Sequence, residues 1–253
     1  MPGPGSDMLR PQVRLREPLA MSTTAGLHRT FQDADAKAES VFDVLRAGGV
    51  AIIPVYAGYG VFGACDEALD AIYAAKRRAS HKLFTLVGNL ELHRQAQVID
   101  GGAGTLVNRV TTDLGYAFGA VAQMRPEHEL IASISPVALA RSSRDGGINI
   151  ILNSGTIMDR LADFSISERL PVFGTSANLS GFGLKGRVKD IEQPVLDAAD
   201  IVIDEGPLPG YSSTIVDFTR RTTVRFGHRY ADVRAIAIEE CGLDLPAAPD
   251  TSQ

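Results

Sequence analysis

Short apolar runs alternate along this chain with segments of helical periodicity, and this alternation most constrains its fold. Residues 35–47 carry apolar side chains at helical spacing, and Gly48 and Gly49 end this helix before the apolar run 50–54. The same alternation predicts further helices at 67–76, 89–99 and 154–164, and further strands at 83–87, 148–152, 170–173, 201–203, 213–218 and 222–226. We therefore expect an α/β protein with a single twisted mixed sheet and flanking helices.

Composition indicates one main domain. The 253 residues, 45% of them hydrophobic and 22% charged, can bury a single sizeable core, which we assign to residues 31–240. We expect residues 1–30 to be a disordered extension and the Pro- and Ala-rich residues 241–253 to be a loose tail. No apolar run approaches the ~18 to 20 residues that a membrane helix needs, and the first 27 residues lack the apolar stretch of a signal peptide. We therefore expect a cytoplasmic protein.

Small polar residues follow the predicted strand at 170–173. The run TSANLSG at 175–181 offers hydroxyls, an amide and backbone N–H groups, among them those of Thr175, Ser176 and Asn178, to an anion beyond the strand end. This pattern favours a phosphate or nucleotide loop. The alternative, which is commoner for any one such run, is a Ser- and Gly-rich turn that satisfies its own backbone.

A basic cluster precedes the predicted strand at 83–87. Lys76, Arg78 and Lys82 belong to a run of cations that suits a polyphosphate, because arginine presents a planar fork to phosphate oxygens and lysine a mobile charge. The alternative is the solvated end of a helix, where cations are favoured by the helix dipole. A net charge of −5 argues against a broad contact with nucleic acid, so direct contact with tRNA is not expected. A second group of arginines, between residues 220 and 234, is interpreted as an exposed edge hairpin.

Taken in order, these motifs resemble the YrdC-type family, whose best-known members are the threonylcarbamoyl-AMP synthases of tRNA modification. Lys76 and Arg78 match its Lys-x-Arg pair, and Ser176 and Asn178 match its Ser-x-Asn motif, the most specific single piece. Further matches are the following lysine, the late Ser-Thr strand and the closing Arg-x-Gly, which fall at Lys82, Ser213 and Arg225. The resemblance covers residues 35–240 and implies the family's mixed sheet with flanking helices.

The chain departs from the family pattern on the side of the small substrate. Val55 follows Pro54 where the family usually has threonine, and residues 114–121 (LGYAFGAV) stand where a Pro-Gly-Pro-x-Thr segment is usual. The counterpart of a central Arg-x-Pro is Leu-Asn-Ser at 152–154. The motifs that face the nucleotide are largely kept and those that face the amino acid are largely altered. Either the acceptor differs, or the chain is a degraded enzyme that still binds nucleotide.

The resemblance implies an ATP-dependent nucleotidyltransferase. In the family, threonine and bicarbonate form N-carboxythreonine, whose carboxylate attacks the α-phosphorus of ATP and expels pyrophosphate; Mg²⁺ arrives with ATP, and a separate carbamoyl transferase receives the product. The residues carried over as catalytic are Lys76, Arg78, Ser176 and Asn178. Those expected to bind nucleotide or phosphate are Lys76, Arg78, Lys82, Thr175, Ser176, Asn178, Ser213 and Arg225. The small-substrate pocket is expected to include Pro54, Val55, Tyr56 and Tyr59.

Three function classes stay open at this point. The first is synthesis of threonylcarbamoyl-AMP from ATP, bicarbonate and L-threonine for tRNA threonylcarbamoyladenosine modification. The second is a carbamoyl-adenylating enzyme of specialised metabolism that uses another acceptor or carbamoyl phosphate. The third is a noncatalytic relative that binds nucleotide or RNA. Cys65 and Cys241 are too few for a disulfide framework or a zinc cluster, so no metal site made of protein ligands alone is expected.

Overall fold

One mixed sheet forms the centre of the molecule. The computed structural model describes residues 31–79, 81–99 and 101–249, so the extension expected at residues 1–30 lies outside the described residues. The strands are β1 (Ala51–Val55), β2 (Gly58–Gly63), β3 (Thr85–Val87), β4 (Gln97–Val98), β5 (Phe118–Met124), β6 (Ser143–Arg144), β7 (Gly147–Leu152), β8 (Phe173–Ser176), β9 (Ile201–Val202), β10 (Thr214–Asp217) and β11 (Thr222–Arg225). Their order is β11-β10-β5-β7-β3-β8-β2-β1-β9, with β4 on β5 and β6 on β7.

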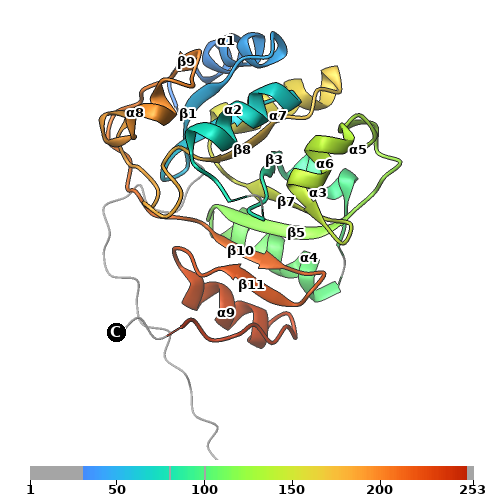
Figure 1. The fold of residues 1–253 in the computed structure, drawn as a ribbon. Helices are drawn as coiled ribbons and strands as arrows, with labels where there is room; N and C mark the ends of the chain where they lie inside the picture. The colour runs from blue at the N-terminus through green and yellow to red at the C-terminus, as the bar shows by residue number, and fades with distance from the viewer. Residues whose placement is uncertain (1–30, 80, 100, 250–253) are drawn as a thin grey trace, which may run out of the picture.

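Helices flank this sheet along its whole width (Figure 1). They are α1 (Ala34–Arg46), α2 (Asp66–Ala75), α3 (Leu90–Ala96), α4 (Gly101–Asn108), α5 (Glu129–Ala132), α6 (Pro136–Ser142), α7 (Thr156–Glu168), α8 (Gln193–Leu196) and α9 (Tyr230–Glu239). Helix α1 packs against α7 and α2 against β2, while α4 packs against α9 at the β10–β11 end. The predicted α/β class and mixed sheet are confirmed. Among the described residues, no helix is long and apolar enough to cross a membrane.

The hydroxyl-rich run at 175–181 begins inside a strand and continues as a turn. We expected a strand at 170–173 with the polar residues beyond it, but β8 begins at Phe173 and ends at Ser176. It pairs antiparallel with β2, so that Gly174 lies opposite Phe62 and Ser176 opposite Gly60. A Cβ on Gly174 would lie 2.2 Å from the ring of Phe62, so a side chain there would displace the phenylalanine. Pro171 has no N–H to donate to a ladder, which agrees with pairing that starts later.

The middle of the chain, whose role the sequence left open, supplies the centre of the sheet. Strand β5 pairs antiparallel with β7 and parallel with β10, and so joins the two halves of the sheet. Periodicity does not predict this strand, because its residues, FGAVAQM, include a glycine and two alanines and only one β-branched side chain. Helix α9 was also missed: Arg229 and Arg234 lie at its start and within it, not on an edge hairpin.

The tail does not behave as expected between residues 241 and 246. Leu245 is 3% exposed and belongs to the main hydrophobic core. The hydroxyl of Tyr230 donates to the carbonyl of Pro246, and Arg234 Nε donates to the carbonyl of Leu245 over 2.9 Å. This part of the chain is therefore a packed strap across α9, and the assignment of a loose tail from residue 241 is wrong for it.

Shortening Leu245 to alanine tests this packing. Because the side chain is fully buried, Leu245→Ala should lower the free energy of unfolding by about 2–4 kcal/mol, measured by urea denaturation. The matched control is Asp244→Ala, since Asp244 is exposed and its loss should change stability by less than about 0.5 kcal/mol. Equal effects of the two substitutions would mean that the strap does not pack.

Candidate functional site

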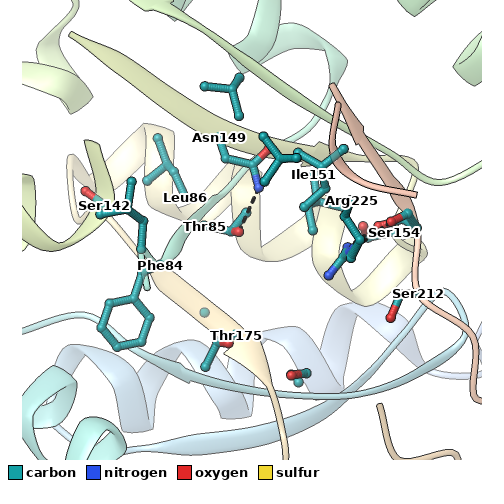
Figure 2. A pocket seen from close by; sticks show the side chains of 18 of the residues that line it. Phe84, Thr85, Leu86, Ser142, Asn149, Ile151, Ser154, Thr175, Ser212 and Arg225 are labelled. Atoms are coloured by element: carbon teal, nitrogen blue, oxygen red, sulfur yellow. Dashed lines mark hydrogen bonds between the residues drawn. The ribbon is translucent and has the colours of Figure 1, made fainter. Parts of the chain in front are cut away.

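A cavity of about 710 Å³ lies over the middle of the sheet, a size suited to a small ligand (Figure 2). Side chains from β3 and β7 form its floor, where Asn149 Nδ2 donates to Thr85 Oγ1 over 2.9 Å. Apolar side chains surround this polar pair: Phe62, Phe84, Leu86, Ile151, Met158 and Ile215. The cavity can therefore take a ligand that is partly apolar.

Two guanidinium groups line the cavity from different elements. Arg78 follows α2, and its Nη2 donates to the carbonyl of Leu83 over 2.8 Å while the guanidinium lies over the ring of Phe84. Arg225, at the end of β11, donates from Nε to the carbonyl of Ser213 over 2.7 Å and from Nη2 to the hydroxyl of Ser213 over 2.8 Å. Burial lowers the pKa of both groups, that of Arg225 to about 10.

Neither guanidinium forms an ion pair with a carboxylate of the described residues. Carbonyl and hydroxyl acceptors do not neutralise a half-buried positive charge, so a site of this kind favours an anion that enters from solvent. Asp217 also lines the cavity, but its Oδ1 accepts the backbone N–H groups of Thr219 and Arg220 and so closes the turn after β10. Lys82 lines the cavity as well and adds to its positive charge.

The Ser-x-Asn segment is divided between the cavity and the protein interior. Thr175 and Ser176 line the cavity, which leaves their predicted role in binding phosphate possible on geometric grounds. Asn178 does not: its side chain is buried, and Nδ2 donates to the carbonyl of Leu179. The structure therefore does not place the Asn178 amide where it would reach a phosphate in the cavity.

Lys76 also lies away from the cavity. It is 1% exposed, and its ammonium donates to the main-chain carbonyls of Ser176 and Asn178. Burial, followed by the charge of Arg78, lowers the pKa of Lys76 to about 7. The expectation that this ammonium contacts the ligand directly is therefore not met in the structure.

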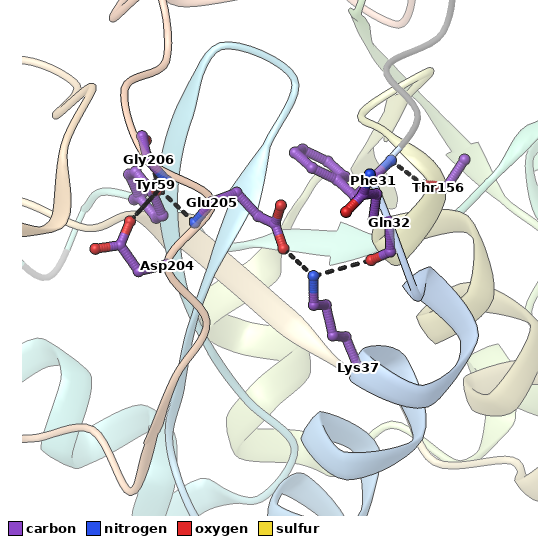
Figure 3. A network of polar contacts seen from close by, with 8 residues as sticks. All are labelled: Phe31, Gln32, Lys37, Tyr59, Thr156, Asp204, Glu205 and Gly206. Atoms are coloured by element: carbon purple, nitrogen blue, oxygen red, sulfur yellow. Dashed lines mark hydrogen bonds and ion pairs between the residues drawn. The ribbon is translucent and has the colours of Figure 1, made fainter.

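The residues expected around the small substrate also separate. Val55 and Tyr56 line the cavity, with the Tyr56 ring 5.8 Å from that of Tyr211, whereas Pro54 and Tyr59 do not line it. The hydroxyl of Tyr59 lies 2.9 Å from Asp204 Oδ1 and accepts the backbone N–H of Glu205 (Figure 3). Burial and the bond to Asp204 raise the pKa of Tyr59 to about 12. Tyr59 therefore fixes the 204–206 segment to the core, and assigning it to the pocket was wrong.

Several residues that line the cavity are not predicted by any sequence motif. Asn149 was visible only as a single polar side chain inside an otherwise apolar predicted strand, and its partner Thr85 comes from a strand more than sixty residues away. Tyr211 lines the cavity and stacks on His228 with ring centroids 3.9 Å apart. No local pattern predicts such contacts, because they depend on how distant strands and loops meet.

Among the described residues, no group of three or more His, Cys, Asp or Glu side chains could hold a metal ion. Besides the Asp217 carboxylate, which is engaged in its own turn, the oxygen groups that line the cavity include the hydroxyls of Thr175, Ser176 and Ser213. Neutral hydroxyls of this kind fit a Mg²⁺ that arrives with phosphate oxygens and keeps several waters.

The comparisons with known proteins agree with this architecture. The family model for Sua5, YciO and YrdC proteins, described as "Telomere recombination", matches residues 43–227. No curated protein matches the chain. A hypothetical protein from Streptococcus mutans has a similar structure, with a TM-score of 0.69 and 14% identity over 88% of this chain and 97% of that one.

Two further solved structures share the fold. YciO from E. coli has a TM-score of 0.63 and 20% identity, covering 82% of this chain and 97% of that one. Sua5 from P. abyssi, solved with L-threonine, has a TM-score of 0.63 and 16% identity, covering 87% of this chain but 62% of its own. The family model matches residues 43–227, which include most of the sheet and the strands that form the cavity. The chain therefore belongs to the Sua5, YciO and YrdC family.

Proposed function

We propose that this chain is an ATP-dependent nucleotidyltransferase that adenylates a carbamate and releases pyrophosphate. The observation that carries the proposal is the pair of half-buried guanidiniums, Arg78 and Arg225, which line one cavity without a carboxylate partner among the described residues. A triphosphate is a ligand whose charge would balance both groups and Lys82. L-Threonine with bicarbonate is the first acceptor to test, because the P. abyssi Sua5 structure contains L-threonine. The product would serve tRNA threonylcarbamoyladenosine modification.

The chemistry asks the protein mainly to position the reactants and to neutralise charge. An oxygen of the N-carboxyamino acid attacks the α-phosphorus, the bond between this phosphorus and the bridging oxygen of pyrophosphate breaks, and pyrophosphate leaves with the electron pair. Arg78 and Lys82 would bind the departing phosphates. Arg225, oriented by Ser213, would bind an anionic group on the other side of the cavity.

The hydroxyls of Thr175 and Ser176 complete this arrangement. They would donate to phosphate oxygens and help to order the Mg²⁺ that accompanies ATP, whose charge further stabilises the pyrophosphate. Because Mg²⁺ retains several waters, no carboxylate cage is needed for this role.

A second candidate is the same reaction with another acceptor. Val55 stands where a hydroxyl is usual in the family, and the floor of the cavity beside Asn149 is largely apolar, with Ile151 and Met158. These side chains would favour an amino acid more apolar than threonine; carbamoyl phosphate is the other donor to test, since its phosphate could meet the same cations. A noncatalytic nucleotide-binding relative is the third candidate, and turnover separates it from the other two.

Pyrophosphate release tests the proposal directly. With ATP, Mg²⁺, bicarbonate and L-threonine, we expect steady release and a threonylcarbamoyl-adenylate detected by mass. Arg78→Met and Arg225→Met should each lower kcat/KM by about 100-fold or more, since each removes a preorganised charge that binds an anionic group of the ligands. Arg221→Met is the matched control: Arg221 is exposed, does not line the cavity, and should leave the rate unchanged.

The acceptor panel decides between the candidates. Release with another amino acid or with carbamoyl phosphate, and none with threonine, would favour the second candidate. ATP binding without release for any acceptor would overturn the enzymatic proposal.

Tyr56 should influence the acceptor more than the nucleotide. Because it lines the cavity near Val55, Tyr56→Ala should change the ratio of kcat/KM between threonine and bulkier amino acids by about 10-fold, the scale expected for pocket shape. The KM for ATP should change much less. Equal losses for ATP and acceptor would show instead that Tyr56 supports the general packing of the cavity.

A further inference from the structure

Lys76 binds the segment 176–180 from the protein interior, on the side away from the cavity that Thr175 and Ser176 line. Its ammonium donates to the carbonyls of Ser176 and Asn178, and its own carbonyl accepts the N–H of Ser180 over 3.1 Å. The three contacts fall on alternate residues of one segment, so a single lysine connects the end of α2 to the whole turn from 176 to 180.

Other bonds to this turn come from outside Lys76. The N–H of Ala177 donates to the carbonyl of Tyr59 over 2.8 Å, and that of Leu179 to Glu192 Oε2 over 2.9 Å. The carbonyl of Ser176 also accepts the N–H of Asn178, which leaves the Asn178 carbonyl most dependent on the ammonium. Loss of the ammonium would leave this acceptor buried without its partner, which is costly.

We propose that Lys76 is a positioning residue, which holds the 176–180 turn from the protein side so that Thr175 and Ser176 present their hydroxyls to the cavity. The expected effect of Lys76 on turnover rests on the proposed function. The statement that Lys76 holds the 176–180 turn does not depend on that function. It also replaces the direct phosphate contact expected for Lys76 with an indirect role through Ser176.

The charges around the ammonium agree with a link to an anionic ligand. Burial first, and then the charges of Arg78 and Lys82, lower the pKa of Lys76, while Glu192 raises it. Glu192 is already engaged by Lys185 over 2.6 Å and by the turn. An anion held by Arg78 and Lys82 would offset their repulsion and so raise the pKa of Lys76. Above about pH 7, where the free protein carries the neutral amine, binding of ATP should therefore take up a proton and weaken as pH rises.

Amide hydrogen exchange without any ligand tests the structural part. Lys76→Met keeps the length of the side chain and removes its donors, so exchange at residues 177–180 should accelerate about 10-fold. Lys82→Met is the comparison, because within the described part of the chain Lys82 makes no hydrogen bond to the turn, so its loss should leave these amides unchanged. Unchanged exchange in Lys76→Met would overturn the proposal. If this variant does not fold, Lys76→Gln takes its place: its amide nitrogen lies one atom short of the Lys76 ammonium and cannot reach both carbonyls, so exchange at residues 177–180 should still accelerate, and unchanged exchange would again overturn the proposal.

A double-mutant cycle tests the functional part. If Lys76 acts through Ser176, Lys76→Met should lower kcat/KM about 100-fold alone, yet add less than about 3-fold in a Ser176→Ala background. With Arg225→Met, on a different strand, the two effects should multiply. Full multiplication with Ser176→Ala would overturn the indirect role and indicate an independent contact with the ligand.

Proton uptake separates this inference from the proposed function. Calorimetry of ATP binding at about pH 8, in buffers of different ionisation enthalpy, should show uptake by the wild type that Lys76→Met lacks. The titration of ATP itself cancels in this comparison; equal uptake by the two proteins would overturn the proton link. A wild type that neither binds nor turns over ATP would overturn the proposed function, while the exchange comparison would still decide whether Lys76 holds the turn.

Discussion

The antiparallel pairing of β2 with β8 is the contact on which the site depends. It places Ser176 opposite Gly60 and Phe62 against Gly174, where only hydrogen leaves room for the ring. On its other side β8 pairs with β3, which carries Thr85 beside the cavity floor. A change in this register by one residue would turn the hydroxyl of Ser176 to the opposite face of the sheet. The geometry of the site is therefore set by strand pairing first and by the polar residues second.

Sequence patterns predicted several helices and strands of this molecule better than the direction in which individual side chains point. The helices near 35–47 and 154–164 and the strand at 148–152 follow from periodicity, because their apolar faces are wide and their ends are marked by glycine or polar residues. Strand β5 was missed because its small residues weaken the strand pattern. Helix α9 was missed because exposed charges interrupt its helical pattern. Both are stabilised by contacts between distant parts of the chain, which no local window contains.

The same limit applies within the site. The motifs pointed to Arg78, Ser176, Ser213 and Arg225, which line one cavity. Their spacing could not tell which neighbouring side chains face the cavity and which face the protein interior. Lys76 and Arg78 are two residues apart at the end of α2, yet Arg78 lines the cavity and the Lys76 side chain points into the protein interior. Tyr59 was misassigned for a similar reason, because neighbouring residues of a hairpin face opposite sides.

The Lys76 ammonium is buried and, among the residues that the structure describes, forms no ion pair with a carboxylate. Burial and the neighbouring cations lower the pKa of Lys76 to about 7, so at low pH the charged form destabilises the empty site relative to an exposed lysine. An apolar side chain of similar size would avoid that cost but would leave the carbonyls of Ser176 and Asn178 without their donor. If the proposed triphosphate occupies the cavity, one ligand offsets the charges of Arg78 and Lys82 and so lessens their repulsion of Lys76 behind it. On that proposal, the site is more stable filled than empty.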